Sequence, residues 1–237
     1  MTFQSSVALN QGFGVVGEIV FEGPLRSTPG VVKGTAANIV VGRAFTIDPA
    51  DGQYQPGVLG VANFGGILAN PKELQSIGPV GGSPLAPTLV VPAGTIGEFV
   101  NMGLLCVALL NAANIGDKVT YATADGQLSA LPQQVNMTGS ITTTVLTIAA
   151  VATGSAPILP GTVLVGPNIV PGTVVISNGT GTGGTGTYNV SVSQTAASGN
   201  VTGDSVAASG QVIIPRAKVV RYANAAAGLA VIALSDA

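Results

Sequence analysis

Residues 118–131 read Lys-Val-Thr-Tyr-Ala-Thr-Ala-Asp-Gly-Gln-Leu-Ser-Ala-Leu and carry the clearest structural signal of the chain. Two strand-like runs, 118–122 and 127–131, flank the step Asp125-Gly126. Asp-Gly is typical of tight hairpins, because such turns need positive φ angles that glycine adopts without a steric penalty. The stretch therefore predicts a β-hairpin with one strand on each side of the turn.

The same kind of pattern extends along most of the chain. Short β-branched runs are separated by Gly, Pro, Asn and Asp, and helical periodicity is nearly absent. Residues 17–23 alternate polar and apolar side chains, with Glu18 and Glu22 on one face of a half-buried strand. Residues 217–222 and 228–234 have the pattern of two paired strands. These features together predict an all-β fold.

Charged residues divide the chain into two parts. From Gln133 to Gly203 the sequence contains no Asp, Glu, Lys or Arg, and Thr, Gly, Val and Ser dominate. Within this stretch Pro-Gly-Thr-Val at 160–163 recurs at 171–174, and a Gly/Thr tract covers 179–187. The change of composition at both ends indicates a separate structural unit.

We infer that this unit is a small β module inserted into another domain. Residues 134–206 form the Gly/Thr/Val-rich module, which we expect to project outward. Residues 1–133 and 207–237 form the parent domain, a β-barrel or β-sandwich. A tandem of two domains is the alternative, but residues 207–237 are too few to bury a core by themselves.

Composition argues against several classes of protein. Charged residues make up 8% of the chain, the net charge is −2, and no basic stripe is present, so we expect no nucleic-acid binding. The longest apolar run, 104–110, is far below the roughly 20 residues of a membrane span, and residues 1–6 show no secretory signal. We therefore expect no membrane and no export route. Because a surface with so few charges is normally covered by a partner, we predict a homo-oligomer.

Catalytic residue types are scarce. The chain has no histidine, which excludes Ser-His-Asp and Cys-His arrangements and imidazole metal ligands. Its one cysteine, Cys106, lies in an apolar run without a cationic neighbour and is interpreted as a core thiol. Gly-x-Gly-x-x-Gly occurs at 12–17 and 181–186, but β-like sequence follows each match where a dinucleotide site needs a helix. We interpret these glycines as loop residues that permit close backbone approach. We predict no catalytic residue and no cofactor, so the chain is not expected to be an enzyme.

Two pairs of carboxylates are candidate sites. Asp48 and Asp51 form a weak calcium-like pattern, but Ca²⁺ takes about six or more oxygens, so an ordinary Asp/Gly turn is favoured and no metal site is predicted. Glu18 and Glu22 could be the acid pair of a glycosidase. Without tryptophan to build sugar subsites, a solvated face or an inter-subunit contact is favoured for this pair.

The densest basic cluster comprises Arg216, Lys218 and Arg221, of which Arg216 and Lys218 share one face of the predicted strand. The cluster is either a solvated strand edge protected by charge or a docking contact to an acidic neighbouring subunit. These three residues, with Glu18 and Glu22, are the candidate contact residues of the chain.

Four segments carry a resemblance to a known family: Val-Gly-Glu-Ile-Val-Phe-Glu-Gly-Pro-Leu-Arg (16–26), Val-Gly-Arg-Ala-Phe-Thr (41–46), Asn-Ile-Gly-Asp-Lys-Val-Thr-Tyr (114–121) and Ala-Ala-Ala-Gly-Leu-Ala-Val-Ile (225–232). They resemble the structural cement, or capsid decoration, proteins of tailed bacteriophages. Residues 134–206 resemble a Gly/Thr-rich module, with the Gly/Thr tract and Tyr188 in it, that recurs in phage and bacterial surface proteins.

The resemblance implies a β-rich protein, commonly a trimer, that is made in the host cytoplasm and sits on the outer capsid surface of the virion. Its partner would be the major capsid protein, and its function would be to clamp neighbouring capsomers. The candidate contact residues would then face the capsid or a neighbouring subunit.

A cell-surface adhesin or a tail-associated binding module is the alternative function. The module has few aromatic residues for carbohydrate recognition and no lysine for the Lys–Asn cross-links of adhesin domains. A non-catalytic structural protein of the virion is therefore the favoured interpretation.

Overall fold

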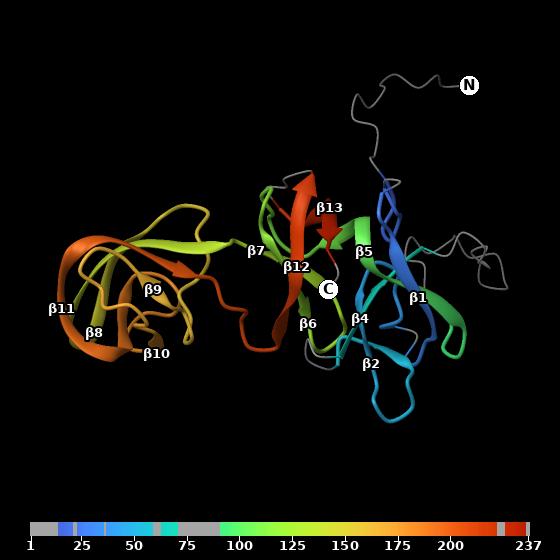
Figure 1. Ribbon diagram of the computed structural model, residues 1–237, viewed down its shortest axis with the longest axis horizontal. Helices are drawn as coiled ribbons and strands as arrows, with labels where there is room; N and C mark the ends of the chain where they lie inside the picture. The colour runs from blue at the N-terminus through green and yellow to red at the C-terminus, as the bar shows by residue number, and fades with distance from the viewer. Residues whose placement is uncertain are drawn as a thin grey trace, which may run out of the picture.

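The computed structural model describes residues 14–20, 23–35, 37–58, 63–70, 91–221 and 226–235, and β-strands dominate this part of the chain (Figure 1). The strands form a nine-stranded and a four-stranded sheet, which confirms the predicted all-β class. They are β1 (Arg26–Val31), β2 (Ala44–Ile47), β3 (Tyr54–Pro56), β4 (Phe64–Leu68), β5 (Ile96–Leu109), β6 (Lys118–Ala122), β7 (Leu128–Leu131), β8 (Gln134–Val151), β9 (Leu164–Val165), β10 (Val175–Asn178), β11 (Gly186–Asp204), β12 (Gln211–Arg221) and β13 (Gly228–Leu234).

Five strands of the larger sheet close into a ring, which we call the first barrel. β13 pairs with β5 and β12, β12 with β6, and β6 with β7. The ring closes where β7 meets β5 at the parallel pair Leu109–Leu128. Leu105, Val119 and Ile232 are fully buried in the hydrophobic cluster of these strands. Of the two predicted architectures, a β-barrel or a β-sandwich, this ring is a β-barrel.

A second ring, the second barrel, uses the other half of β5. Residues 96–102 of β5 pair with β1, β4 pairs with β5 and β2, and β2 pairs with β3. A bridge between Val32 and Tyr54 joins the end of β1 to β3 and closes this ring. In its core the rings of Tyr54 and Phe99 stack with centroids 3.9 Å apart, and Phe45 lies 5.2 Å from Phe99. The two barrels thus share one strand, and we call them together the double barrel.

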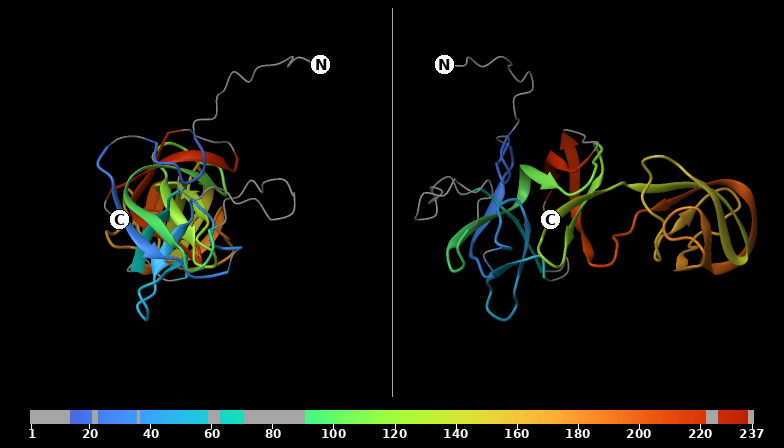
Figure 2. Two further views of the ribbon diagram at one scale, coloured as in Figure 1. Left: turned by 90° about the vertical axis from the view of Figure 1, so that its right-hand side faces the viewer. Right: turned by 180° about the vertical axis from the view of Figure 1, so that it is seen from behind.

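The four-stranded sheet is built from residues 134–204 and lies apart from the double barrel (Figure 2). β8 and β11 pair antiparallel along most of their length, as a long curved ribbon. β10 pairs with one half of β11 and β9 with the other, and a bridge between Val163 and Val174 joins them. The ribbon therefore closes around its own core, in which Leu146, Ile158 and Tyr188 are fully buried.

The Gly/Thr tract wraps the ring of Tyr188. The Tyr188 hydroxyl donates to the Gly184 carbonyl at 2.7 Å and accepts from the Gly183 amide at 2.9 Å. A Cβ at Gly181 would lie 2.4 Å from the tyrosine ring, closer than any side chain allows. The tract is a loop that needs close backbone approach, as its sequence predicted.

The two crossings of the chain between the sheets lie side by side. The Ser205 amide and hydroxyl both donate to the Gln133 carbonyl, at 3.2 and 2.9 Å. The Lys118 ammonium lies 3.3 Å from the Asp204 carboxylate. Residues 133 and 205 are thus held together where the chain enters and leaves residues 134–204.

The predicted hairpin is confirmed, because β6 and β7 pair antiparallel with Val119 opposite Ala130. Gly126 has a φ of +73°, and the Asp125 carboxylate accepts the Gln127 amide at 3.1 Å. Only the glycine adopts positive φ, because the connection is longer than a two-residue turn.

Two further strand predictions have different outcomes. The pair predicted at 217–222 and 228–234 is confirmed by the pairing of β12 with β13. Of the strand predicted at 17–23, the structure has a single bridge, between Ile19 and Leu105. Residues 21 and 22 lie outside the described residues, so the face predicted for Glu22 is not observed.

Candidate functional site

The basic cluster lies on β12 of the first barrel. Arg216, Lys218 and Arg221 are all exposed, while Ala217 and Val219 between them are buried. Arg216 and Lys218 therefore lie on one face, as the alternation predicted. Among the described residues, none forms an ion pair with any of these three cations. The cluster is thus available for a partner.

A large irregularity in β12 positions Arg216. β12 pairs with β6 at Ile213 and next at Lys218. Between these two pairs lie four residues of β12 but only one residue of β6. Arg216 has a φ of +53°, a left-handed conformation that costs a non-glycine residue about 1–2 kcal/mol. The strand departs from regular pairing where it presents this guanidinium.

Lys118 adds a cation that the sequence did not place at this cluster. Lys218 pairs directly opposite Lys118, so two lysines lie opposite each other on neighbouring strands. Like charges in this position are destabilising. Asp204 offsets part of this repulsion, since its carboxylate lies 3.3 Å from Lys118, but it is itself largely exposed. The pairing of β6 with β12, which sequence spacing does not reveal, produces this arrangement.

The structure does not bring Glu18 to the basic cluster. The Glu18 carboxylate accepts the Val15 amide at 3.0 Å and so holds the turn before Ile19. Its segment pairs with β5, and β13 lies between β5 and β12, which separates the backbones of the two sites by about 14 Å at usual strand spacing. Glu22 lies outside the described residues.

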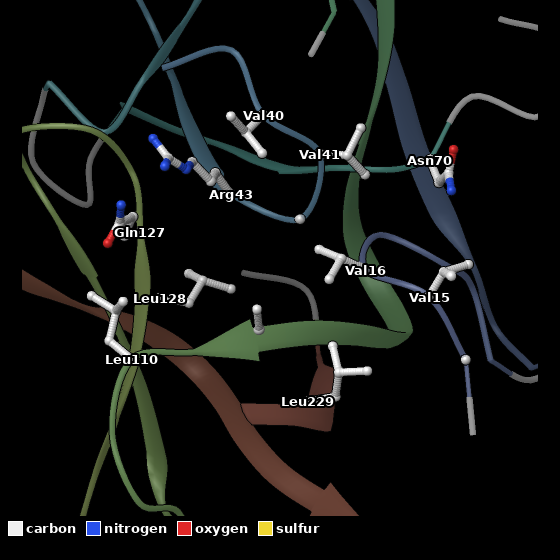
Figure 3. Close-up of a pocket in the computed structure, with 13 residues that line it drawn as sticks. Val15, Val16, Val40, Val41, Arg43, Asn70, Leu110, Gln127, Leu128 and Leu229 are labelled. Carbon is white, nitrogen blue, oxygen red and sulfur yellow. The ribbon is translucent and has the colours of Figure 1, made fainter. Parts of the chain in front are cut away.

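A mostly apolar cavity of about 390 Å³ lies where the two barrels meet (Figure 3). Its polar lining groups include Arg43, Asn70 and Gln127, and most of the others are aliphatic. The Arg43 guanidinium lies 3.4 Å from the Asp125 carboxylate and donates to the Asp125 carbonyl at 3.2 Å, so its charge already has a partner. Lining residues that Figure 3 shows as aliphatic are Val15, Val16, Val40, Val41, Leu110, Leu128 and Leu229.

The calcium-like turn is occupied by a side chain of the protein. The Lys33 ammonium binds the carboxylates of both Asp48 and Asp51. The hydrogen bond from Lys33, with one from a backbone amide, lowers the pKa of each carboxyl below its usual range, and the same contacts raise the pKa of Lys33. The two aspartates therefore serve an ion-paired turn, in agreement with the turn interpretation.

Cys106 is buried in the first barrel. Burial, assisted by the nearby charge of Glu18, raises the pKa of its thiol, so the reactive thiolate is disfavoured. This environment supports the interpretation of Cys106 as a core residue.

Within the described ranges, no group of three or more His, Cys, Asp or Glu side chains could hold a metal ion. No helix in that part of the chain is long and apolar enough to cross a membrane.

Comparison with known proteins gives a matching family and similar solved structures. A family model described as "Structural cement protein (E217 gp24/Pam3 gp6)" matches residues 3–166. A chain of the structure titled "The capsid of Myoviridae Phage XM1" is similar over 99% of this chain and 98% of its own length, at 12% identity and a TM-score of 0.47. The search of curated proteins gives no significant match. The family match extends past Gln134 to the end of β9, so it includes part of the stretch interpreted as an insert.

Proposed function

This chain belongs to the family of phage structural cement proteins, and from that membership we propose separate functions for the double barrel and for residues 134–206. Its function is structural: it stabilises the capsid of the virion, on which it sits. We propose that the double barrel binds the outer face of the major capsid protein across neighbouring capsomers. A structural family also supports the prediction that the chain is not an enzyme, and it does not favour the adhesin alternative.

The proposed capsid contact rests on the exposed basic cluster of β12. In a chain with only 8 Lys and Arg, three exposed cations within six residues have no ion-pair partner among the described residues. An acidic surface of the capsid protein is the complementary partner. Glu18 supports its own turn and Glu22 is not described, so neither carries this proposal.

We propose further that the protein is a homotrimer. Support comes from the family resemblance and from large apolar side chains on the double barrel, of which Ile96 is 70% and Ile115 is 66% exposed. Side chains of this kind are commonly covered by a partner when they gather in patches.

Residues 134–206 are proposed to form an inserted module that projects from the capsid. Its two ends are hydrogen-bonded to each other through Ser205 and Gln133, so the parent chain could be rejoined across a short gap. Insertions are tolerated at such sites because bridging them costs little loop entropy.

The test of the capsid contact is the double substitution Arg216→Glu and Lys218→Glu. Because both side chains are exposed, the fold should persist, while affinity for shells that lack the native protein falls by about tenfold or more. Occupancy should also fall with rising salt for the native chain. Arg26→Glu, at an exposed arginine on β1 that donates to the Asn101 side chain at 3.0 Å, reverses one charge away from the cluster and should bind normally. A folded double variant with native occupancy would exclude the basic cluster as the contact.

A further inference from the structure

The two Pro-Gly-Thr-Val repeats of the module form equivalent turns. Gly161 and Gly172 both have positive φ, +98° and +83°. In each turn the threonine amide donates to a carbonyl three residues earlier, Thr162 to Leu159 at 3.0 Å and Thr173 to Val170 at 3.2 Å. The repeated sequence thus gives a repeated backbone.

The repeats also pair with each other. The Leu164 amide donates to the Thr173 carbonyl at 2.8 Å, and the Val175 amide donates to the Thr162 carbonyl at 2.9 Å. Exchanging one repeat for the other exchanges these two bonds, so a local two-fold axis passes between Val163 and Val174, which form an antiparallel bridge.

This pairing creates an apolar surface. Thr162, Leu164, Thr173 and Val175 are buried, so the alternate residues point away from the module core. We call these outward residues the β9–β10 face; they are Val163, Val165, Val174 and Ile176. Val163, Val165 and Ile176 are 41%, 64% and 59% exposed. The face is a contiguous patch of β-branched side chains on two neighbouring strands, unlike the single exposed apolar residues found on most proteins.

Charge decides which partner fits this face. The chain has no charged side chain from Gln133 to Gly203, so the module offers nothing to pair with ions on a partner. A charged partner surface would lose its hydration there without compensation. A second copy of the module is equally neutral and apolar, and the local two-fold axis suits a contact in which the same patch is used twice.

We propose that the β9–β10 face is a two-fold contact between the modules of two copies of this chain. In this contact Val163 and Val165 of one copy lie on Val174 and Ile176 of the other. The patch is small, so the contact is weak between free proteins and forms when copies are held close together on the shell. The modules then link neighbouring bound copies, a function separate from that of the basic cluster.

The experiment uses Val165→Cys in the full chain bound to shells, followed by a short bismaleimide cross-linker. The only native thiol, Cys106, is buried, so the new thiol is the reactive one. We expect a covalent dimer of this chain. Val58→Cys, on the double barrel and exposed to 53% against 64% for Val165, should give at least about tenfold less dimer. Monomer alone from Val165→Cys, equal dimer from both variants, or a product joined to the capsid protein would each overturn the proposal.

A second variant separates the contact from mere proximity. Adding Ile176→Glu to Val165→Cys places an unpaired carboxylate in the contact without touching the core, and should reduce the dimer yield by about tenfold or more at unchanged occupancy. An undiminished yield would show that the two faces do not meet. Because occupancy is read separately, failure of this proposal is distinguishable from failure of the capsid contact.

Discussion

Every charged residue of the chain except Asp204 lies in residues 1–133 or 207–237, which include the double barrel, whereas residues 134–203 of the module are rich in Thr, Ser, Gly and Val. Their cores are alike, since both bury β-branched and aromatic side chains between paired strands. The two regions stabilise their turns by different interactions. Lys33 holds two aspartates in the double barrel, while in the module the amides of Thr180 and Thr187 each donate to the hydroxyl of the other at 3.0 Å. Hydroxyl and backbone hydrogen bonds therefore suffice to stabilise the turns of residues 134–203, where no charged side chain is present.

The largest expected effect tests whether the two regions unfold separately. Tyr188→Ala removes a fully buried ring and should cost the module about 3–5 kcal/mol. Hydrogen exchange followed by mass spectrometry should show loss of protection in β8 and β11, with β5 and β13 still protected. Tyr188→Phe, which keeps the ring and loses the bonds to Gly183 and Gly184, should cost about 1–2 kcal/mol. Equal loss of protection in both regions would mean that they form one cooperative unit.

A smaller effect distinguishes the glycines of the two regions. Gly126 in the double barrel and Gly172 in the module both have positive φ, at +73° and +83°. A Cβ at Gly126 would lie 2.2 Å from the Ala44 carbonyl oxygen, whereas one at Gly172 meets nothing within 4 Å. Gly126→Ala should therefore destabilise by about 2–3 kcal/mol and Gly172→Ala by about 1 kcal/mol in chemical denaturation. A reversed order would contradict this account of the hairpin.

Low pH should destabilise the double barrel more than the module. Asp48 and Asp51 have lowered pKa values when folded, so their stabilising effect is present above the ordinary aspartate pKa of about 4 and is lost as pH falls through the lower folded values. Between Gln133 and Gly203 the module has no Asp or Glu to titrate in this range. Hydrogen exchange compared at pH 6 and pH 3 should show weakened protection around β2 and β3 and unchanged module stability. Lys33→Met should remove much of this acid sensitivity. Loss of protection in the module at pH 3 would contradict the expected difference between the two regions.

The smallest expected effect is on capsid binding after removal of the module. Joining Gln133 to Ala207 through a short Gly/Ser linker deletes residues 134–206 and leaves the basic cluster in place. The truncated chain should melt cooperatively and occupy shells as the native chain does. A folded truncated chain that fails to bind would show that the module itself is the capsid contact.

Local signals in the sequence predicted the local parts of this fold. Asp125-Gly126 located the hairpin, and the two-residue spacing of Arg216 and Lys218 predicted that both would be exposed on one strand. The sharing of β5 was not predictable, because its partners lie at distant positions such as 26–31 and 228–234, and no local pattern records that pairing.

The parts of the candidate sites that sequence reasoning missed depend on the same long-range pairings. Lys118 joins the basic cluster only because β6 lies beside β12. The Pro-Gly-Thr-Val repeat was visible, but its pairing across Val163 and Val174, and the apolar face that results, required the strands to be placed in space.

β5 also has a mechanical consequence. Its residues 96–102 belong to the second barrel and residues 103–109 to the first, so the barrels are joined by one continuous covalent strand. A force that pulls on one barrel is transmitted to the other through peptide bonds and the strands hydrogen-bonded along β5, without relying on a packed interface that could slide. A protein that stabilises a capsid would gain stiffness from this construction.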